Sequence, residues 1–212
     1  VMIDVPGSSG SLPNRLLLAV SNGSTITNAS NFTFYFFQTD ATNFGDYPTL
    51  GIDNNALYIG MNMFTPAGAF ANTNAFVVRK SSLTGGGPIV VTTFASLLPN
   101  SSGAGPFTPQ GVDNYDSAAT EGYFIGVDNA AFGLLQVRRV STPGGTPTLS
   151  GNLSVTVPPT AFPATVPHFG NTGGTNGRLD PVDDRLFAAH IRNGRLWTAH
   201  NIQVNKIGRA HV

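Results

Sequence analysis

The sequence predicts an all-β protein, and its composition is the first observation that points there. Glutamate and lysine, which usually cover the exposed faces of helices, are limited to Glu121, Lys80 and Lys206 in 212 residues. Asparagine, threonine, serine, glycine and proline, which favour turns and strand surfaces, are abundant instead. No stretch approaches the roughly 18 consecutive apolar residues that a membrane-spanning helix needs.

The second observation is a pattern of four short strands that occurs twice. Asp53 and Asp113 mark equivalent places in the two copies, 60 residues apart. The strands are expected at residues 48–53, 57–62, 75–83 and 88–94, and again at 109–113, 122–128, 133–140 and 152–157. Four antiparallel strands joined by short turns and repeated side by side are typical of β-propeller blades.

We therefore predict a partial β-propeller of four-stranded antiparallel blades, about two of them complete and two partial. Strands at 15–20 and 32–37 are expected to close the first partial blade. The blades are placed at residues 12–41 (partial), 46–98, 106–158 and 178–205 (partial), in one incomplete domain that spans residues 1–206.

Equivalent residues of the blades predict how the blades pack. Glycine is expected where the innermost strands crowd together, because it permits close approach of two backbones; the candidates are Gly51, Gly60, Gly111 and Gly126. Tyr58, Tyr123 and Trp197 align with one another and are expected in the core between blades. The basic pairs that begin at Arg79 and Arg138 are expected to have a structural role.

Residues 181–192 fit two structures. Asp180 as a cap, Pro181 at the first position and acidic residues in the first turn favour a helix. Asn193-Gly194 also suits a tight turn between two strands at 185–192 and 195–201. The alignment with the other blades favours the hairpin.

The last six residues, 207–212, are expected to be an artefact. They can be encoded by a nucleotide sequence that resembles a common short-read sequencing adapter. This predicts a metagenomic fragment whose native protein sequence ends near Asn205. An ordinary basic tail is the alternative, and residues 207–212 are given no functional role.

Charge and missing motifs exclude several classes of function. The eleven basic and eleven acidic side chains cancel, so no net field favours nucleic acid. The absence of cysteine excludes a disulfide framework, a thiol nucleophile and a thiolate metal site. Neither the serine hydrolase motif G-x-S-x-G nor a phosphate-binding P-loop occurs.

Three segments carry a resemblance to known proteins. Residues 46–53 (DYPTLGID), 76–83 (FVVRKSSL) and 194–200 (GRLWTAH) resemble secreted bacterial β-propeller proteins that are mostly uncharacterised. The architecture that this resemblance implies is broadly similar to that of sialidase-like propellers. The sialidase Asp-box, S-x-D-x-G-x-T-W, does not occur, so the resemblance does not extend to sialidase activity.

The candidate binding residues are polar or aromatic and lie near predicted strand ends. They are Asp46, Tyr47, Gln110, Asp113, Asp180, Asp183, Arg185, His190 and Trp197. No cofactor and no metal site is expected. Asp180, Asp183 and Asp184 leave Ca²⁺ open as an alternative, because carboxylate oxygens are its preferred ligands; a metal shared by His190 and His200 is a weaker one.

These features predict a non-catalytic extracellular or cell-surface module whose loops bind carbohydrate or a cell-surface protein. One alternative is a fragment of a propeller-fold glycoside hydrolase, which would need two converging carboxyl groups. Aspartates such as Asp53, Asp113 and Asp116, or Glu121, would supply them. The other alternative is a structural module of a larger adhesin or cell-wall protein.

Overall fold

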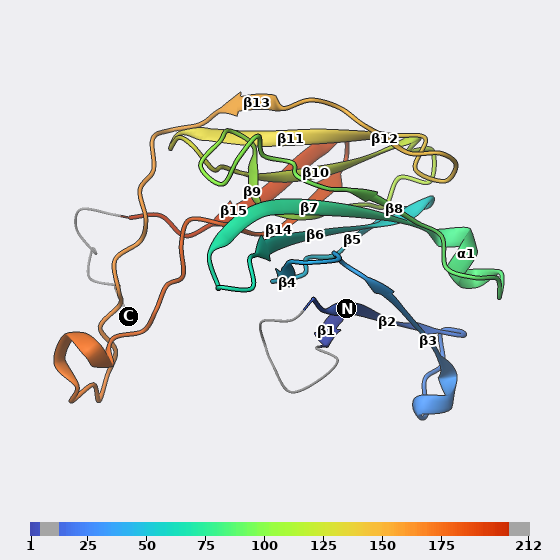
Figure 1. The fold of residues 1–212 in the computed structure, drawn as a ribbon, viewed down its shortest axis with the longest axis horizontal. Coiled ribbons are helices and arrows are strands. Elements are labelled where there is room, and N and C mark those ends of the chain that lie inside the picture. The colour runs from blue at the N-terminus through green and yellow to red at the C-terminus, as the bar shows by residue number, and fades with distance from the viewer. Residues whose placement is uncertain (5–12, 204–212) are drawn as a thin grey trace.

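The computed structural model describes residues 1–4 and 13–203, and strands make up almost half of them (Figure 1). The strands are β1 (Met2–Asp4), β2 (Arg15–Ser21), β3 (Phe32–Gln38), β4 (Phe44–Asp46), β5 (Gly51–Ile52), β6 (Ala56–Phe64), β7 (Phe70–Arg79), β8 (Val91–Phe94), β9 (Pro106–Asn114), β10 (Glu121–Asp128), β11 (Leu134–Ser141), β12 (Thr148–Leu149), β13 (Leu153–Thr156), β14 (Leu186–Arg192) and β15 (Arg195–His200). The described helices are α1 (Lys80–Thr84) and two 3-10 turns, η1 (Ala29–Asn31) and η2 (Gly174–Gly177). The all-β prediction is confirmed.

The strands form three curled sheets that lie on one another as layers (Figure 1). The first has the order β1-β2-β3. The second has the order β4-β6-β7-β8, with β5 also paired to β6. The third has the order β12-β11-β10-β9-β14-β15, with β13 also paired to β11. Residues 46–98 and 106–158 thus contain most of the second sheet and of the third, as the four-strand pattern predicts.

The first seam joins the first sheet to one face of β6 and β7. Because side chains alternate across a strand, β6 presents two buried faces to two different sheets. On this side Leu16 and Leu18 of β2 pack on Ile59, Met61 and other apolar side chains of the second sheet. Because both faces of β6 are buried, its sequence is a nearly continuous apolar run rather than an alternation of apolar and polar residues.

The second seam joins the other face of β6 and β7 to β9, β10 and β11. Tyr58 is fully buried there with Phe124, edge to face, at a centroid distance of 5.8 Å. Its hydroxyl donates to Asp53 Oδ2 at 2.7 Å, and burial together with this bond raises the pKa of Tyr58. The prediction that Tyr58 belongs to the core between units is confirmed.

Backbones approach closely along the second seam. A Cβ atom on Gly60 would lie 1.8 Å from the carbonyl oxygen of Pro109, and one on Gly111 would lie 2.0 Å from that of Tyr58. Such distances exclude any side chain, so glycine is required at both places. Gly51 meets the Gly111 backbone in the same way, whereas Gly126 is crowded by Phe107 of its own sheet.

One buried asparagine forms hydrogen bonds across each of these two seams. Asn14 donates to the carbonyl of Gly45 and accepts from its N–H, both at 2.7 Å. Asn62 accepts from the N–H of Thr108 at 3.1 Å and donates to its hydroxyl at 2.9 Å. An amide side chain suits this place because it donates and accepts at once.

The basic pairs also tie the units together. Arg79 donates through Nη2 to the carbonyl of Gly145, and Arg138 donates through Nη1 to the carbonyl of Leu97 at 3.4 Å. Each guanidinium therefore reaches from its own sheet to the facing one, and burial lowers the pKa of Arg138. Their predicted structural role is confirmed.

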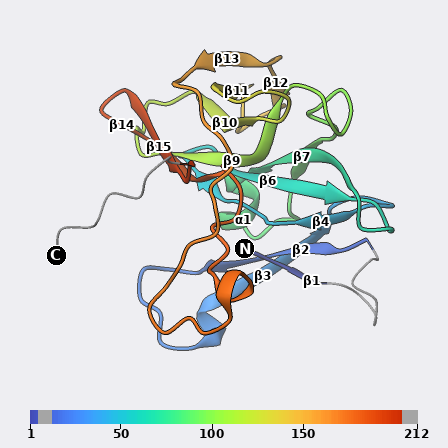
Figure 2. The same cartoon turned by 90° about the vertical axis from the view of Figure 1, so that its left-hand side faces the viewer.

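The third seam joins β9 and β10 to the β14–β15 hairpin (Figure 2). Residues 186–192 are a strand, so the hairpin prediction is confirmed, and Asn193 and Gly194 turn with φ of 51° and 69°. β14 pairs in parallel with β9, placing Ala189 opposite Val112. A separate fourth blade is therefore not observed, because the hairpin has added to the free edge of β9.

Several expected strands are shorter than predicted, among them those at 88–94 and 152–157, which cover Val91–Phe94 and Leu153–Thr156. The chain leaves β7 after Arg79 and forms α1, so residues 80–83 are helical rather than extended. β5 covers only Gly51–Ile52 of the expected 48–53. The predicted artefact at 207–212 lies outside the described residues.

Candidate functional site

A pocket opens at one end of the third seam. Its lining comes from the start of β9, from the end of β10 and the loop that follows it, from the connector between β13 and β14, and from the acidic residues that precede β14. We call it the Asp184 pocket. It is lined by Phe107, Val127, Asp128, Asn129, Ala130, Ala131, Phe132, Phe162, Asp183 and Asp184.

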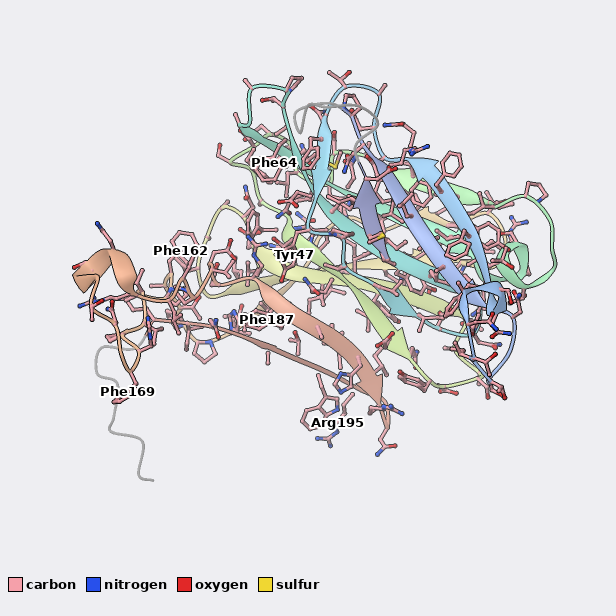
Figure 3. The ribbon with its side chains drawn as sticks, turned by 90° about the horizontal axis from the view of Figure 1, so that it is seen from below. Tyr47, Phe64, Phe162, Phe169, Phe187 and Arg195 are labelled. Carbon is pink, nitrogen blue, oxygen red and sulfur yellow. The ribbon has the colours of Figure 1, made fainter. Side chains whose placement is uncertain are left out.

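Phenyl rings form one side of the Asp184 pocket. The rings of Phe132 and Phe162 meet edge to face, with centroids 5.0 Å apart and planes inclined by 78°. Both side chains are exposed, at 47% and 59%. Phe162 lies on the long connector, away from Arg195 at the tip of the hairpin (Figure 3). Half-buried Phe107 adds a third ring, so the pocket offers apolar faces to a ligand.

Asp128 is buried, and neutral donors surround its carboxylate. Oδ1 accepts from the N–H groups of Ala130 and Ala131, both at 2.9 Å. Oδ2 accepts from the N–H of Gly105 at 3.0 Å and from Nε2 of Gln136 at 2.6 Å. These four bonds fix the loop after β10 and satisfy the carboxylate without an adjacent positive charge.

Arg185 joins two sequence-distant groups of predicted residues. Its Nε and Nη2 donate to the two carboxylate oxygens of Asp183, each at 2.7 Å. Its guanidinium lies over the ring of Tyr47 at 4.4 Å, with the ring of Phe107 at 5.6 Å. Burial by itself lowers the pKa of Arg185, but the hydrogen bonds and charge of Asp183, together with the charges of Tyr47 and Asp46, outweigh burial and raise the pKa. The structure thus brings Asp46, Tyr47, Asp183 and Arg185 together.

Asp184 is only 4% exposed. Burial is the main cause that raises its pKa, and the neighbouring charge of Asp183 adds to the effect. Its own amide and His200 act in the opposite direction. His200 donates through Nδ1 to the Asp184 carbonyl, not to the carboxylate. No hydrogen bond from another described residue reaches this carboxylate.

Three other predicted acids accept hydrogen bonds from backbone amides, whereas Glu121 accepts from the hydroxyl groups of Tyr123 and Ser141. Asp53 accepts from the amides of its own turn, Asn55 and Ala56, as well as from Tyr58. Asp180 accepts from the amide of Val182, two residues on. Asp113 accepts from the amide of Ile52 in the facing unit at 2.8 Å. These carboxylates shape turns and seams.

Three predicted binding residues lie away from the pocket. Gln110 is buried and donates to the carbonyl of Thr108. His190 and Trp197 are opposite each other on the outer face of the hairpin, where Trp197 is 54% exposed. The expectation that Trp197 would be core is wrong, because no described strand covers that face. His190 and His200 are not cross-strand neighbours either, since His200 pairs with Leu186.

The metal alternatives gain no support from the geometry. Within residues 1–4 and 13–203, no three histidine, aspartate or glutamate side chains are grouped closely enough to hold an ion. Asp180 and Asp183 of the expected calcium cluster instead accept hydrogen bonds from the amides of Val182 and Arg185.

The aromatic side of the pocket and Asp128 are not among the binding residues that the sequence predicts. Phe107, Phe132 and Phe162 lie at a strand start, in a loop and in a connector, where no periodic pattern marks them. Asp128 did carry a signal, because it aligns with Asn62 and replaces an amide that both donates and accepts with a group that only accepts.

Comparison of the chain with protein-family models, curated proteins and solved structures found no match. In the part of the chain that the structure describes, no helix combines the length and apolar character needed to cross a membrane.

Proposed function

We propose that the chain is a non-catalytic binding module of an extracellular β-propeller protein and that it binds a saccharide in the Asp184 pocket. The observation that carries the proposal is a pocket that combines exposed phenyl rings with the carboxylate of Asp184, which accepts no hydrogen bond from another described residue. Sugar rings have apolar faces and polar edges, so they suit a pocket that combines apolar walls with a few placed polar groups.

Corresponding features of the two four-stranded units support a propeller. Tyr47 and Thr108, at the same place in each, have left-handed backbones with φ of 52° and 45°, and a proline follows each. Gly51 and Gly111 then meet where the two units approach. In a propeller, the inner strands of neighbouring blades likewise lie close together around the central axis.

The use of the carboxylates supports a module without catalysis. Hydrolysis of a glycosidic bond needs two carboxyl groups that both face the substrate. Asp53, Asp113 and Asp180 serve amides instead, and Asp183 is paired with Arg185. Asp184 is the acid of the pocket that lacks a partner among the described residues, and it has no second free carboxylate beside it.

Calorimetric titration with a panel of oligosaccharides tests the proposal. Phe162→Ala and Phe132→Ala are expected to weaken binding about tenfold each, because each truncation removes a ring from the pocket wall. Phe34→Ala is the matched control, since Phe34 is an exposed phenylalanine on β3, far from the pocket.

Failure of every saccharide to bind would contradict the proposal, as would equal losses in Phe34→Ala and Phe162→Ala. Release of reducing ends from a bound oligosaccharide would overturn the non-catalytic part and favour the glycoside hydrolase alternative.

A further inference from the structure

The charges around the Asp184 pocket are unbalanced. Its lining contains three carboxylates, those of Asp128, Asp183 and Asp184, and no lysine, arginine or histidine. Arg185 lies just outside, and both of its donor edges in this direction are engaged by Asp183. Among the described residues, the guanidinium that follows the pocket acids in the chain is therefore already paired.

Neither of the remaining two carboxylates forms an ion pair with another described residue. Asp128 is held by four neutral N–H donors. The groups that face Asp184 are Asp183 on its own segment and His200 on β15, and His200 binds the Asp184 carbonyl. Asp184 is 4% exposed as a residue and lines the pocket, and its carboxylate accepts no hydrogen bond from another described residue, so a cationic ligand in the pocket can supply a donor.

The aromatic rings next to these acids attract the same kind of group. Phenyl faces bind cations through the ring quadrupole, most strongly where water is excluded. Phe107, Phe132 and Phe162 line the same pocket as the three acids. Carboxylates and ring faces in one pocket select an organic cation, because a bare metal ion needs converging oxygen ligands, which the described residues do not supply.

We infer that the Asp184 pocket recognises a saccharide that carries a free ammonium group, with the ammonium bound between the Asp184 carboxylate and the phenyl rings. The inference rests on the proposed function, since it specifies the ligand class of the same pocket. The ammonium donates to the buried carboxylate and neutralises it, while the sugar ring contacts Phe132 and Phe162.

The experiment compares two ligands that differ only at the nitrogen. A glucosamine trisaccharide and an N-acetylglucosamine trisaccharide are titrated into the full chain by calorimetry at about pH 6, below the pKa of an ordinary amine. The amine form is expected to bind about tenfold more tightly, a difference of ~1.4 kcal/mol. Asp184→Asn is expected to abolish that preference.

Asp116→Asn is the matched control, because Asp116 is an exposed aspartate outside the pocket that caps the amide of Ala118. Equal affinity for the two trisaccharides, or a preference that survives Asp184→Asn, would overturn the inference and leave the proposed function standing. Binding of neither trisaccharide, nor of any other oligosaccharide, would overturn both. Circular dichroism spectra of the variants establish that a lost preference is not a loss of folding.

Discussion

The second and third seams are built from corresponding strands but end differently. In the second, the Asn62 side chain bridges to Thr108 with one donated and one accepted bond, and the interface is closed. In the third, Asp128 occupies the aligned position, and its carboxylate serves the amides of its own unit. The Asp184 pocket lies beyond it.

One functional group explains this difference. A carboxylate lacks the N–H that the asparagine uses to reach across, so Asp128 cannot form the two-way bridge. The residues ahead of β14 are also acidic, and they would repel it. The amide at this position of the second seam thus bridges two sheets, whereas the acid at the aligned position of the third seam binds donors of its own sheet and the loops that flank it.

The largest effect is expected where backbones meet in the second seam. Gly60→Ala places a Cβ atom 1.8 Å from the carbonyl oxygen of Pro109, so the two sheets must separate. We expect a loss of about 3 kcal/mol or more in the free energy of unfolding, measured by urea denaturation. Gly23→Ala, which meets nothing within 4 Å, should change it by less than about 0.5 kcal/mol. A stable Gly60→Ala protein would show that the sheets do not meet there.

The buried hydroxyl of Tyr58 should contribute the next largest effect. Tyr58→Phe leaves Asp53 Oδ2 without its donor and is expected to cost about 1–3 kcal/mol. The pKa of Tyr58 is raised in the folded state, so its contribution holds below the ordinary tyrosine pKa of about 10 and is lost as the pH rises further. The free energies of unfolding of the native chain and of Tyr58→Phe should differ at neutral pH and become similar at alkaline pH. Tyr115→Phe, at an exposed tyrosine, should match the native chain throughout.

Exchanging the amide of Asn62 and the acid of Asp128 tests whether these groups account for the difference between the second and third seams. Asn62→Asp removes the donor to the Thr108 hydroxyl, and Asp128→Asn removes acceptor capacity that four N–H groups use. Each is expected to lower the free energy of unfolding by about 1–3 kcal/mol. If Asn62→Asp left stability unchanged in thermal unfolding, the bridge would not fasten the second seam.

The smallest effect on stability is expected at Asp184. Because the pKa of its carboxyl is raised, the folded state favours the protonated form, and this contribution is present below about pH 4 and lost as the pH rises. Asp184→Asn resembles the protonated form at every pH. Its Tm at pH 7 should equal that of the native chain or exceed it by about 2–4 °C, and the difference should vanish on acidification. A lower Tm would mean that the carboxylate is satisfied within the protein.

The sequence predicted the features that depend on local chemistry. Strand positions, the Asn193-Gly194 turn and the crowded glycines at 51, 60 and 111 followed from alternation, turn preference and the 60-residue spacing. Asp46, Tyr47, Asp183 and Arg185 were selected as polar residues at strand ends, but their meeting depends on how the units stack. The parallel pairing of β14 with β9 depends on a free strand edge, which no local pattern reports. The phenyl rings of the pocket come from loops, where side-chain placement depends on tertiary contacts.

The most direct test of the account is to map the ligand on the folded chain. Amide chemical shifts of ¹⁵N-labelled protein should be followed during titration with the glucosamine trisaccharide. We predict that the shifts change at residues 128–132, at Phe162 and at residues 183–185, and not at Tyr58, Asn62 or Thr108. Changes centred on the second seam, or on His190 and Trp197 of the outer hairpin face, would contradict the claim that the open third seam is the binding site.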